Sequence, residues 1–563
     1  MRPLNRNAPY GLEGGHMGSA DTFYTWSEAW IAKWLEEAPS LATVSGDHRF
    51  DDRLADYSKS GLTRQQQMLE SGLATLDSMD VADWTIDEKI DHTLLVHLAK
   101  QQLRGLTTMR IHRRDPGIYV NEATQGVFLL IMRDFAPIGD RLRNAAARMR
   151  AIPRIFEEAK ANLEITEIPR VWAELAAEQA ASAPGLFAVL LPRLAQEEAP
   201  DLVDEVTAAG NQAAGAATQF IEFLNREVLP RAAGDFAVGE ALFNSILRGD
   251  HLVDYDVREM LAEGWRQFES TERQMTEIAS QIDPEKTVHE IIEEAKGDHP
   301  TAEGLLDAYR DAMNAARKFI IDHDVVTVPE NESMQVIETP TFLRPILPYA
   351  AYMPAGIFEE SQDGTFIVTP VDPDASPEEK EQKLKGHAYV KLPITALHEA
   401  YPGHHLQISL ANRTATLPRR LGTFLSTLFA EGWAFYCEEL METLGFISKP
   451  VQRLARLKDQ RWRAARIILD GSLHTGAMTV DEGIAFLEER CQLEHTNAVA
   501  EVRRYTQTPT QPQSYLMGKL ELIKLIDDYR AACPTASLRE IHDAILACGS
   551  LPPKLLRMAL LQA

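Results

Sequence analysis

Cysteine is scarce in this chain of 563 residues: there are four, at positions 437, 491, 533 and 548, and no two form a C-x-x-C pair. This spacing excludes a zinc ribbon and a dithiol redox motif. No run of about 18 apolar residues, the length of a membrane-spanning helix, is visible. The amino-terminal 20 or so residues lack the apolar core of a signal peptide. These absences predict a cytoplasmic protein without a membrane partner, and a flexible leader at 1–22.

Positive charge is also in short supply. Lys and Arg number 57 against 83 Asp and Glu, which gives a formal net charge of -26. Grooves for nucleic acid and surfaces for anionic membranes need clustered Lys and Arg to replace counterions, so the composition argues against both kinds of partner. An acidic surface instead has a weak attraction for cations, including divalent metals.

The hydrophobic pattern divides the chain into three structural regions. Apolar residues recur every three or four positions through 23–324, which predicts a helical lobe. Between 325 and 392, β-branched residues and prolines replace that period and predict a small insert of short strands. Helical patterning resumes at 393 and continues to 563, so we expect a second helical lobe that carries the chemistry.

Residues 392–412 read LPITALHEAYPGHHLQISLAN, and Glu399 is their only carboxylate. A charge within an apolar helix is costly unless it is paired or bound to a metal. In the zinc motif H-E-x-x-H, two histidines one turn apart bind the ion and the Glu takes a proton from its water. Here Pro402 stands four residues after His398, so the regular motif is absent.

On a straight helix His404 lies roughly 120° away from the face of His398, and His405 lies about 10.5 Å farther along the axis. Pro402 cannot donate to the carbonyl group of His398, and Gly403 tolerates unusual dihedral angles, so we predict a bulge in the helix. A bulge of two residues brings His404 to the second ligand position. His405 is the alternative ligand or a substrate contact. The purely structural interpretation is that Pro-Gly ends one helix and begins another.

Residues 423–437, TFLSTLFAEGWAFYC, contain one charged residue, Glu431. A helix that is apolar on nearly every face is buried, so Glu431 should be buried with it, and a metal is its best-attested partner. We therefore predict Glu431 as the third metal ligand. Glu438 and Glu442 lie nearer the polar end of the helix, and we expect them to be solvated.

Four motifs carry a resemblance to a known family: HEAYPGHHLQ at His398, AEGWAFYCE at Ala430, DGSLH at Asp470 and RRYTQTPTQPQSY at Arg503. Over nearly the whole chain they resemble the proteins with the domain of unknown function 885. The first motif is also similar to the H-E-x-G-H stretch of helical gluzincins such as thimet oligopeptidase and Taq-type carboxypeptidases, with two residues inserted. The resemblance implies a mainly α, two-lobed, gluzincin-like fold with a deep cleft.

The same resemblance implies roles for individual residues. His398, His404 and Glu431 correspond to the ligands of one Zn2+ ion, and Glu399 to the general base. In gluzincins the third ligand is a Glu on a helix that follows the His-bearing one. Other divalent metals remain compatible with two imidazoles and a carboxylate.

Related gluzincins stabilise the reaction's oxyanion with a Tyr or His from the late part of the chain. By that resemblance Tyr515 is the first candidate and His474 the second. Arg504 is a candidate partner for a substrate carboxylate, because its guanidinium binds in a two-pronged way. Asp470 shares a helix face with His474 and is expected to orient it or a ligand, with Tyr505 beside them. This charged face consists of Arg463, Arg466, Asp470 and His474.

Together these residues predict a zinc-dependent metallopeptidase that cleaves peptide bonds: Glu399 deprotonates the metal's water and returns the proton to the leaving amine. Its partner is a peptide or a small amide, and the strand-rich insert could offer a strand edge to an extended peptide. One alternative is a metal-dependent amidohydrolase or lyase that acts on a small modified amino acid. The other is a catalytically degenerate scaffold that only binds.

Overall fold

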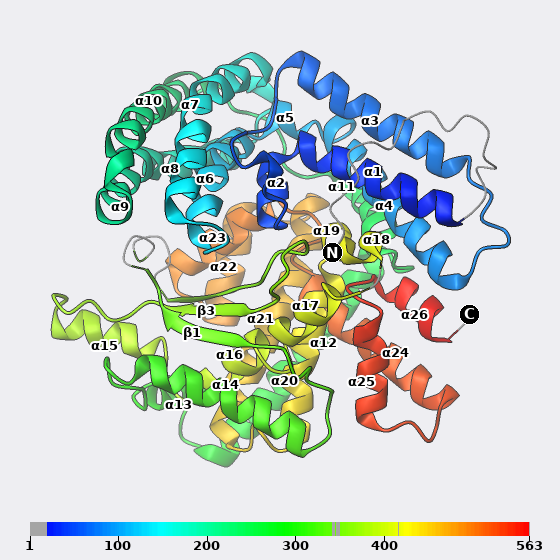
Figure 1. Cartoon of the computed structure of the whole chain (residues 1–563). Helices are drawn as coiled ribbons and strands as arrows, with labels where there is room; N and C mark the ends of the chain where they lie inside the picture. The colour runs from blue at the N-terminus through cyan, green and yellow to red at the C-terminus, as the bar shows by residue number, and fades with distance from the viewer. Residues whose placement is uncertain (1–19, 341–343, 345–348, 415, 562–563) are drawn as a thin grey trace. The chain divides into compact units, whose positions relative to one another are not determined.

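The computed structural model describes residues 20–340, 344, 349–414 and 416–561. Within them the chain is mainly helical, with one small three-stranded sheet (Figure 1). The predicted fold class, mainly α with a small strand-rich insert, is therefore confirmed. The first 19 residues of the predicted leader at 1–22 lie outside the described residues, and helix α1 begins at Ala20.

The chain forms two compact units, one of residues 1–236 with 356–360, and one of 237–355 with 361–563. The boundary that we predicted at 324 lies inside the second unit. The physical reason is that α12 (Val257–Ile282) packs along α21 (Pro450–His474), so the two belong to one core. The predicted deep cleft stays a prediction.

The first unit is a set of helices whose interior is formed by α6, α7, α8 and α10. Its Phe156 and Phe220 rings stack at 4.6 Å between centroids. The stretch Arg170–Glu198 is apolar and long enough to cross a membrane by length and composition alone, a property that core helices of soluble proteins share. The elements are α1 Ala20–Glu37, α2 Pro39–Val44, α3 Lys59–Asp77, α4 Ile86–Thr107, α5 Ile111–Arg114, α6 Gly117–Met132, α7 Ile138–Asn162, α8 Arg170–Gly185, α9 Leu191–Glu198 and α10 Val203–Phe223, with short turns η1 His48–Phe50, η2 Ile165–Glu167, η3 Leu186–Leu190, η4 Pro200–Leu202 and η5 Leu224–Val228.

The second unit contains the sheet and the remaining helices. Several of these begin with a Ser, Thr or Asp that caps the first turn together with a Glu three residues later, as Thr479 and Glu482 do for α22. The helices, besides α12 and α21, are α11 Gly239–Ile246, α13 Val288–Ala295, α14 Leu305–Asp322, α15 Pro377–Lys385, α16 Leu392–Glu399, α17 His404–Ala411, α18 Leu417–Arg420, α19 Gly422–Leu425, α20 Leu428–Thr443, α22 Val480–Cys491, α23 His495–Tyr505, α24 Ser514–Ala532, α25 Leu538–Ala547 and α26 Pro553–Leu561, with η6 Leu247–His251.

The sheet has the strand order β1-β3-β2. The central strand β3 (Gly364–Val368) runs parallel to β1 (Met334–Glu338) and antiparallel to β2 (Ala350–Met353). Helix α14 packs on β1 and on α16, and so connects the sheet to the His-bearing segment.

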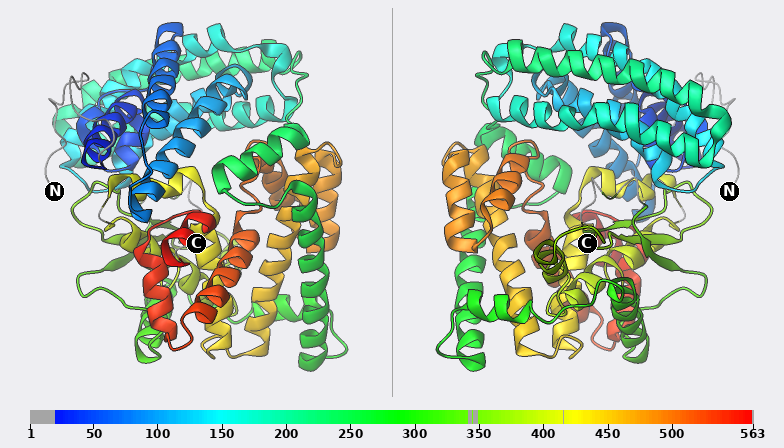
Figure 2. Two further views of the ribbon diagram at one scale, coloured as in Figure 1. Left: turned by 90° about the vertical axis from the view of Figure 1, so that its right-hand side faces the viewer. Right: turned by 90° about the vertical axis from the view of Figure 1, so that its left-hand side faces the viewer.

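Two close helix pairs form the frame of the second unit. Figure 2 shows α12 and α21 side by side over most of their length. Helices α20 and α24 approach so closely that a Cβ atom at Gly518 would overlap the carbonyl oxygen of Leu428. Glycine at this crossing therefore lets two buried helices bring their side chains, including Glu431 and Tyr515, toward a common region.

Candidate metal centre

The His-bearing segment is divided into two helices, because the predicted bulge of two residues interrupts the helix completely. Helix α16 ends at Glu399 and α17 begins at His404. In the turn between them, the Gly403 N–H donates to the Leu397 carbonyl oxygen at 3.0 Å. A Cβ atom at Gly403 would overlap the carbonyl oxygen of His398, so only glycine fits here. The Leu406 N–H likewise donates to the Ala400 carbonyl oxygen at 3.3 Å, so both bonds skip two residues more than a regular helical bond does.

This turn nevertheless brings the three predicted ligands together. Ligand atoms of His398, His404 and Glu431 all lie within 4.8 Å of one another, and they form the one such group of three His, Cys, Asp or Glu found among the described residues. His404 Nε2 lies 3.5 Å from Glu431 Oε2. A tetrahedral zinc ion with bonds of about 2.1 Å separates its ligand atoms by roughly 3.4 Å. The spacing therefore fits one cation better than a direct hydrogen bond.

Glu438 was expected to be solvated, and this expectation is wrong. It is 2% exposed, and its Oε1 lies 2.7 Å from His398 Nδ1. The residue lies seven positions after Glu431 on α20, two turns along the same face. A carboxylate that accepts a hydrogen bond from the Nδ1–H group fixes the ring and leaves Nε2 free to bind a metal, an arrangement common around metal-bound histidines.

Electrostatics in the group favour the charged forms of its members. Burial alone would raise the pKa of Glu431, but the neighbouring His404 imidazole and the charges of His398 and Arg466 outweigh it, so the pKa falls to about 2. Burial would likewise lower the pKa of His398, but Glu438 raises it above its ordinary value. Glu431 thus stays a carboxylate at any physiological pH.

His405, the alternative ligand, faces away from this group. Its Nδ1 bonds to the Tyr352 hydroxyl at 2.9 Å, and its Nε2 bonds to Glu332 Oε1. The imidazole and the Glu332 carboxylate are both fully buried. With both ring nitrogens bonded to protein groups, His405 anchors α17 to β2 and to the segment before β1.

Glu399, the predicted base, is the last residue of α16 and lies next to His398 in the chain. Its side chain is half-buried, and no described residue donates a hydrogen bond to its carboxylate. Burial and the charge of Glu399 raise the pKa of Tyr309, and burial together with Tyr401, Glu399 and Glu332 raises that of Tyr352. The Glu399 carboxylate therefore lies close enough to Tyr309 and Tyr352 to affect their pKa values. Its oxygen atoms remain available to accept a proton.

Tyr515, the first oxyanion candidate, lies in the first turn of α24. Burial raises the pKa of its hydroxyl, and the nearby Glu431 carboxylate raises it further. The guanidinium carbon of Arg466 lies 4.6 Å from the centroid of the Tyr515 ring, and that of Arg463 lies 5.8 Å from it. The structure thus brings Tyr515 into the surroundings of the predicted metal ligands, and the raised pKa favours the protonated phenol.

Asp470 and His474 bond to the backbone of the region around residues 505–513. Asp470 is fully buried and accepts hydrogen bonds from the backbone N–H groups of Thr510 at 3.0 Å and Gln513 at 3.3 Å. His474 is also fully buried, and its Nε2 bonds to the Tyr505 carbonyl oxygen at 2.9 Å. Asp470 therefore holds the turn that leads into α24 and positions Tyr515, which lies two residues after that turn.

Arg504 and Tyr505 belong to a network centred on one carboxylate. Glu501 Oε2 accepts from Arg504 Nη2 at 3.1 Å and from Arg466 Nη2 at 3.0 Å, and it also bonds the Tyr505 hydroxyl. Arg466 Nε donates to the same hydroxyl at 3.0 Å. Arg504 is further bonded to Gln511 at 3.2 Å. This network fixes Arg466 against the Tyr515 ring.

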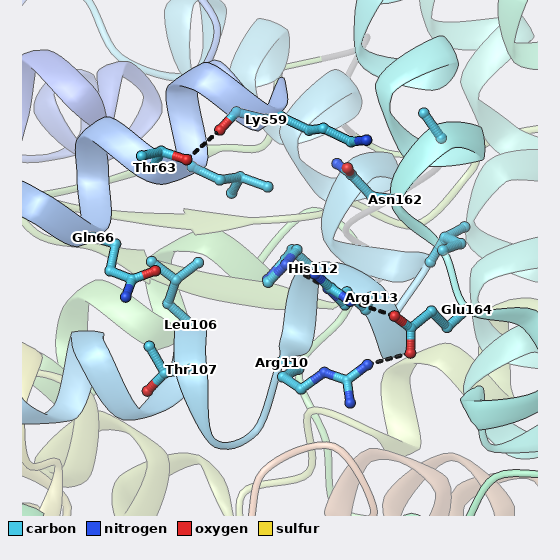
Figure 3. Close-up of a pocket in the computed structure, with 13 residues that line it drawn as sticks. Lys59, Thr63, Gln66, Leu106, Thr107, Arg110, His112, Arg113, Asn162 and Glu164 are labelled. Atoms are coloured by element: carbon cyan, nitrogen blue, oxygen red, sulfur yellow. Dashed lines mark hydrogen bonds and ion pairs between the residues drawn. The ribbon is translucent and has the colours of Figure 1, made fainter.

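The first unit has a separate pocket with a volume of about 830 Å³ (Figure 3). Arg110 and Arg113 reach into it, and both pair with Glu164. Lys59 lies on the α3 side. The pocket presents polar and cationic groups, but it holds none of the predicted site residues, and the metal-ligand group belongs wholly to the second unit.

Comparison with known proteins gives a family and a fold. A family model with the description "Bacterial protein of unknown function (DUF885)" matches residues 39–560. A solved structure from Shewanella oneidensis is 24% identical and has a TM-score of 0.80, covering 97% of this chain and 100% of its own. One from Colwellia psychrerythraea is 18% identical with a TM-score of 0.78, covering 97% and 99%. No curated protein matches the chain.

These neighbours also correct the predicted location. Both are described as a "putative lipoprotein", which does not agree with a cytoplasmic protein, and we withdraw the cytoplasmic prediction. The argument from cysteine failed for a physical reason. A helical protein of this size buries enough apolar surface to fold without disulfides in any compartment, so few cysteines say little about location.

Proposed function

The chain belongs to DUF885, a bacterial protein family of unknown function. From the geometry of the candidate site we propose that it is a zinc-dependent hydrolase of amide bonds in peptides. One observation carries the proposal: ligand atoms of His398, His404 and Glu431 lie within 4.8 Å of one another, and Glu399 directly follows His398.

The donor set fits zinc. Two imidazoles and one carboxylate are the ligands of many catalytic zinc sites, which leave a further coordination position open. Glu438 bonds to Nδ1 of His398 and supports the ring as a partner outside the ligand set. When bound, a zinc ion lowers the pKa of water and polarises a carbonyl group.

The protein's own residues perform the remaining steps. Glu399 accepts a proton from the attacking water and returns it to the leaving amine as the C–N bond breaks. Tyr515, whose pKa is raised above its ordinary value, keeps its proton and donates a hydrogen bond to the oxyanion. Asp470 positions Tyr515 through the turn at Thr510 and Gln513.

Metal analysis and peptide cleavage test the proposal. We expect about one zinc per chain after expression with zinc, and cleavage of members of a peptide library that is lost in Glu399→Gln. Glu442→Gln is the matched control. Glu442 lies on the same helix as Glu431 and pairs with Arg453 and Arg456, so its loss should leave cleavage intact.

Each alternative has its own signature in this experiment. Metal below about a tenth of an equivalent would favour a binding scaffold. Zinc binding without cleavage of any peptide would favour an amidohydrolase or lyase that acts on small modified amino acids. Equal cleavage by Glu399→Gln and wild type would show that Glu399 is not the base.

A further inference from the structure

Arg463 is a cation without a hydrogen-bond partner next to the candidate site. No described residue accepts a hydrogen bond from it, and its ion pair with Asp459 is long, at 3.9 Å between Nη1 and Oδ1. Its Nε is buried and unbonded, although the side chain as a whole is 15% exposed. An Arg carries five N–H donors, and a buried donor without an acceptor is unfavourable.

The position of Arg463 places this cation close to the metal ligands. Its guanidinium carbon lies 5.7 Å from the ring centroid of Phe435, which follows Glu431 by one turn of α20, and 5.8 Å from that of Tyr515. The guanidinium carbon of Arg466 also lies near Tyr515, 4.6 Å from the centroid of its ring. Two guanidinium groups therefore border the tyrosine proposed to bind the oxyanion.

Cations outnumber carboxylates in the ion pairs that involve Arg463, Arg466 and their partners. Asp459 is closer to Lys391, at 2.9 Å, than to Arg463. Glu501 forms ion pairs with both Arg466 and Arg504. Four cations thus share two carboxylates, and Arg463 is the one of the four with no ion pair to a described residue shorter than 3.9 Å, so it is available to an anionic group.

We propose that Arg463, with Arg466 beside it, binds the free carboxylate of the substrate. A planar guanidinium matches a carboxylate through two parallel hydrogen bonds, which would satisfy the donors that Arg463 leaves open. The substrates are then peptides or N-acyl amino acids whose carboxyl end lies next to the cleaved amide, and the products are a shortened acid and a free amino acid. This inference rests on the proposed hydrolysis and names its substrate class.

Binding to the zinc-loaded Glu399→Gln protein tests the subsite without requiring turnover. Calorimetry would compare one short peptide that ends in a carboxylate with the same peptide as an amide. We expect the acid to bind at least tenfold more tightly. Arg463→Met should remove most of that difference. Arg463→Lys should retain part of it, because Lys keeps the positive charge but cannot form two parallel hydrogen bonds with a carboxylate. Arg490→Met is the control: this Arg pairs with Glu272 on α12 and should leave the ratio unchanged.

The outcomes separate the subsite from the proposed reaction. Equal binding of acid and amide, or binding of neither, overturns the subsite whatever the cleavage results. A preference for the acid that Arg463→Met abolishes supports it, even if the wild type cleaves no peptide and the proposed hydrolysis fails. Circular dichroism checks that each variant is folded, and Arg463→Lys decides the matter if Arg463→Met does not fold.

Discussion

The buried carboxylates of the second unit differ in the groups that balance them. Glu438 faces an imidazole, as does Glu332, whereas Asp470 faces only two backbone N–H groups. A carboxylate beside an imidazole can hold the ring in one orientation. A carboxylate that receives only amide donors bears most of the cost of its own burial, and its protonation becomes sensitive to pH.

Glu438→Gln should weaken zinc binding by about 10- to 100-fold, the usual cost of removing a partner of a metal-bound histidine. The amide side chain has nearly the same shape but no charge, so it holds the Nδ1–H of His398 less strongly. A competition titration with a chelating dye would measure the zinc dissociation constant. Glu442→Gln serves again as the control, and equal weakening in both variants would contradict the role assigned to Glu438.

Asp470 should make the stability of the protein depend on pH. Burial, only partly offset by the Thr510 and Gln513 N–H groups, raises the pKa of Asp470 to about 8, against about 3.9 in an unfolded chain. Between about pH 4 and pH 8, the Asp470 carboxyl is therefore protonated in the native state but ionised in the unfolded state. The free energy of unfolding contributed by this group falls as pH rises through that interval and levels off above it.

Denaturant unfolding at several pH values would measure this effect. Asp470→Asn cannot ionise, so its stability should fall less steeply between pH 5 and pH 8 than that of the wild type, with a difference of roughly a few kcal/mol across the interval. Asp481→Asn, at an exposed position in the first turn of α22, should follow the wild type. Parallel curves for all three proteins would refute the assigned pKa shift.

At the scale of elements, the junction between α16 and α17 decides the geometry of the site. The two helices meet at a four-residue turn, and Gly403 lies against the carbonyl group of His398. The spacing of the histidines is therefore set by backbone packing in the turn. A helix wheel cannot describe this arrangement, because the two histidines lie on different helices.

Gly403→Ala should destabilise the protein by about 1–3 kcal/mol, the usual cost of overpacking, and should reduce zinc affinity at least tenfold. The added Cβ atom must push His398 and His404 apart. Thermal unfolding and the dye titration would measure the two effects. Gly105→Ala, in α4 with open space around the position, is the matched control and should be neutral or slightly stabilising. Normal zinc binding by Gly403→Ala would show that the turn does not set the ligand spacing.

Sequence reasoning succeeded where local pattern determines structure. The helical periodicity, the change of pattern after residue 325 and the isolated charge of Glu431 in an apolar helix all correspond to observed elements. It failed where a contact joins distant parts of the chain. Glu438 looked solvated because it lies near the polar end of its helix, but its partner His398 is 40 residues away. Asp470 likewise bonds to a turn some 40 residues later, which no periodicity reveals.

At the scale of the whole molecule, one unit carries the chemistry proposed here. The three ligands, Glu399, Tyr515 and the arginine subsite all belong to the second unit. The helices of residues 237–322, which precede the sheet, pack into that same unit through α12 and α21. The unit that carries the site is thus assembled from segments on both sides of the sheet in the sequence.

Zinc should therefore stabilise the second unit first. A ligand that binds only the native state adds about 2.7 kcal/mol to the free energy of unfolding at 100 times its dissociation constant. Hydrogen exchange with and without zinc should show slower exchange in α16, α17 and α20, which carry the ligands, and little change in α7 and α10 of the first unit. His404→Ala should abolish the effect because it removes a ligand. Zinc bound by residues of α16, α17 and α20 should slow exchange mainly in these three helices. Uniform slowing in both units, or slowing that persists in His404→Ala, would therefore show that zinc binds at another site.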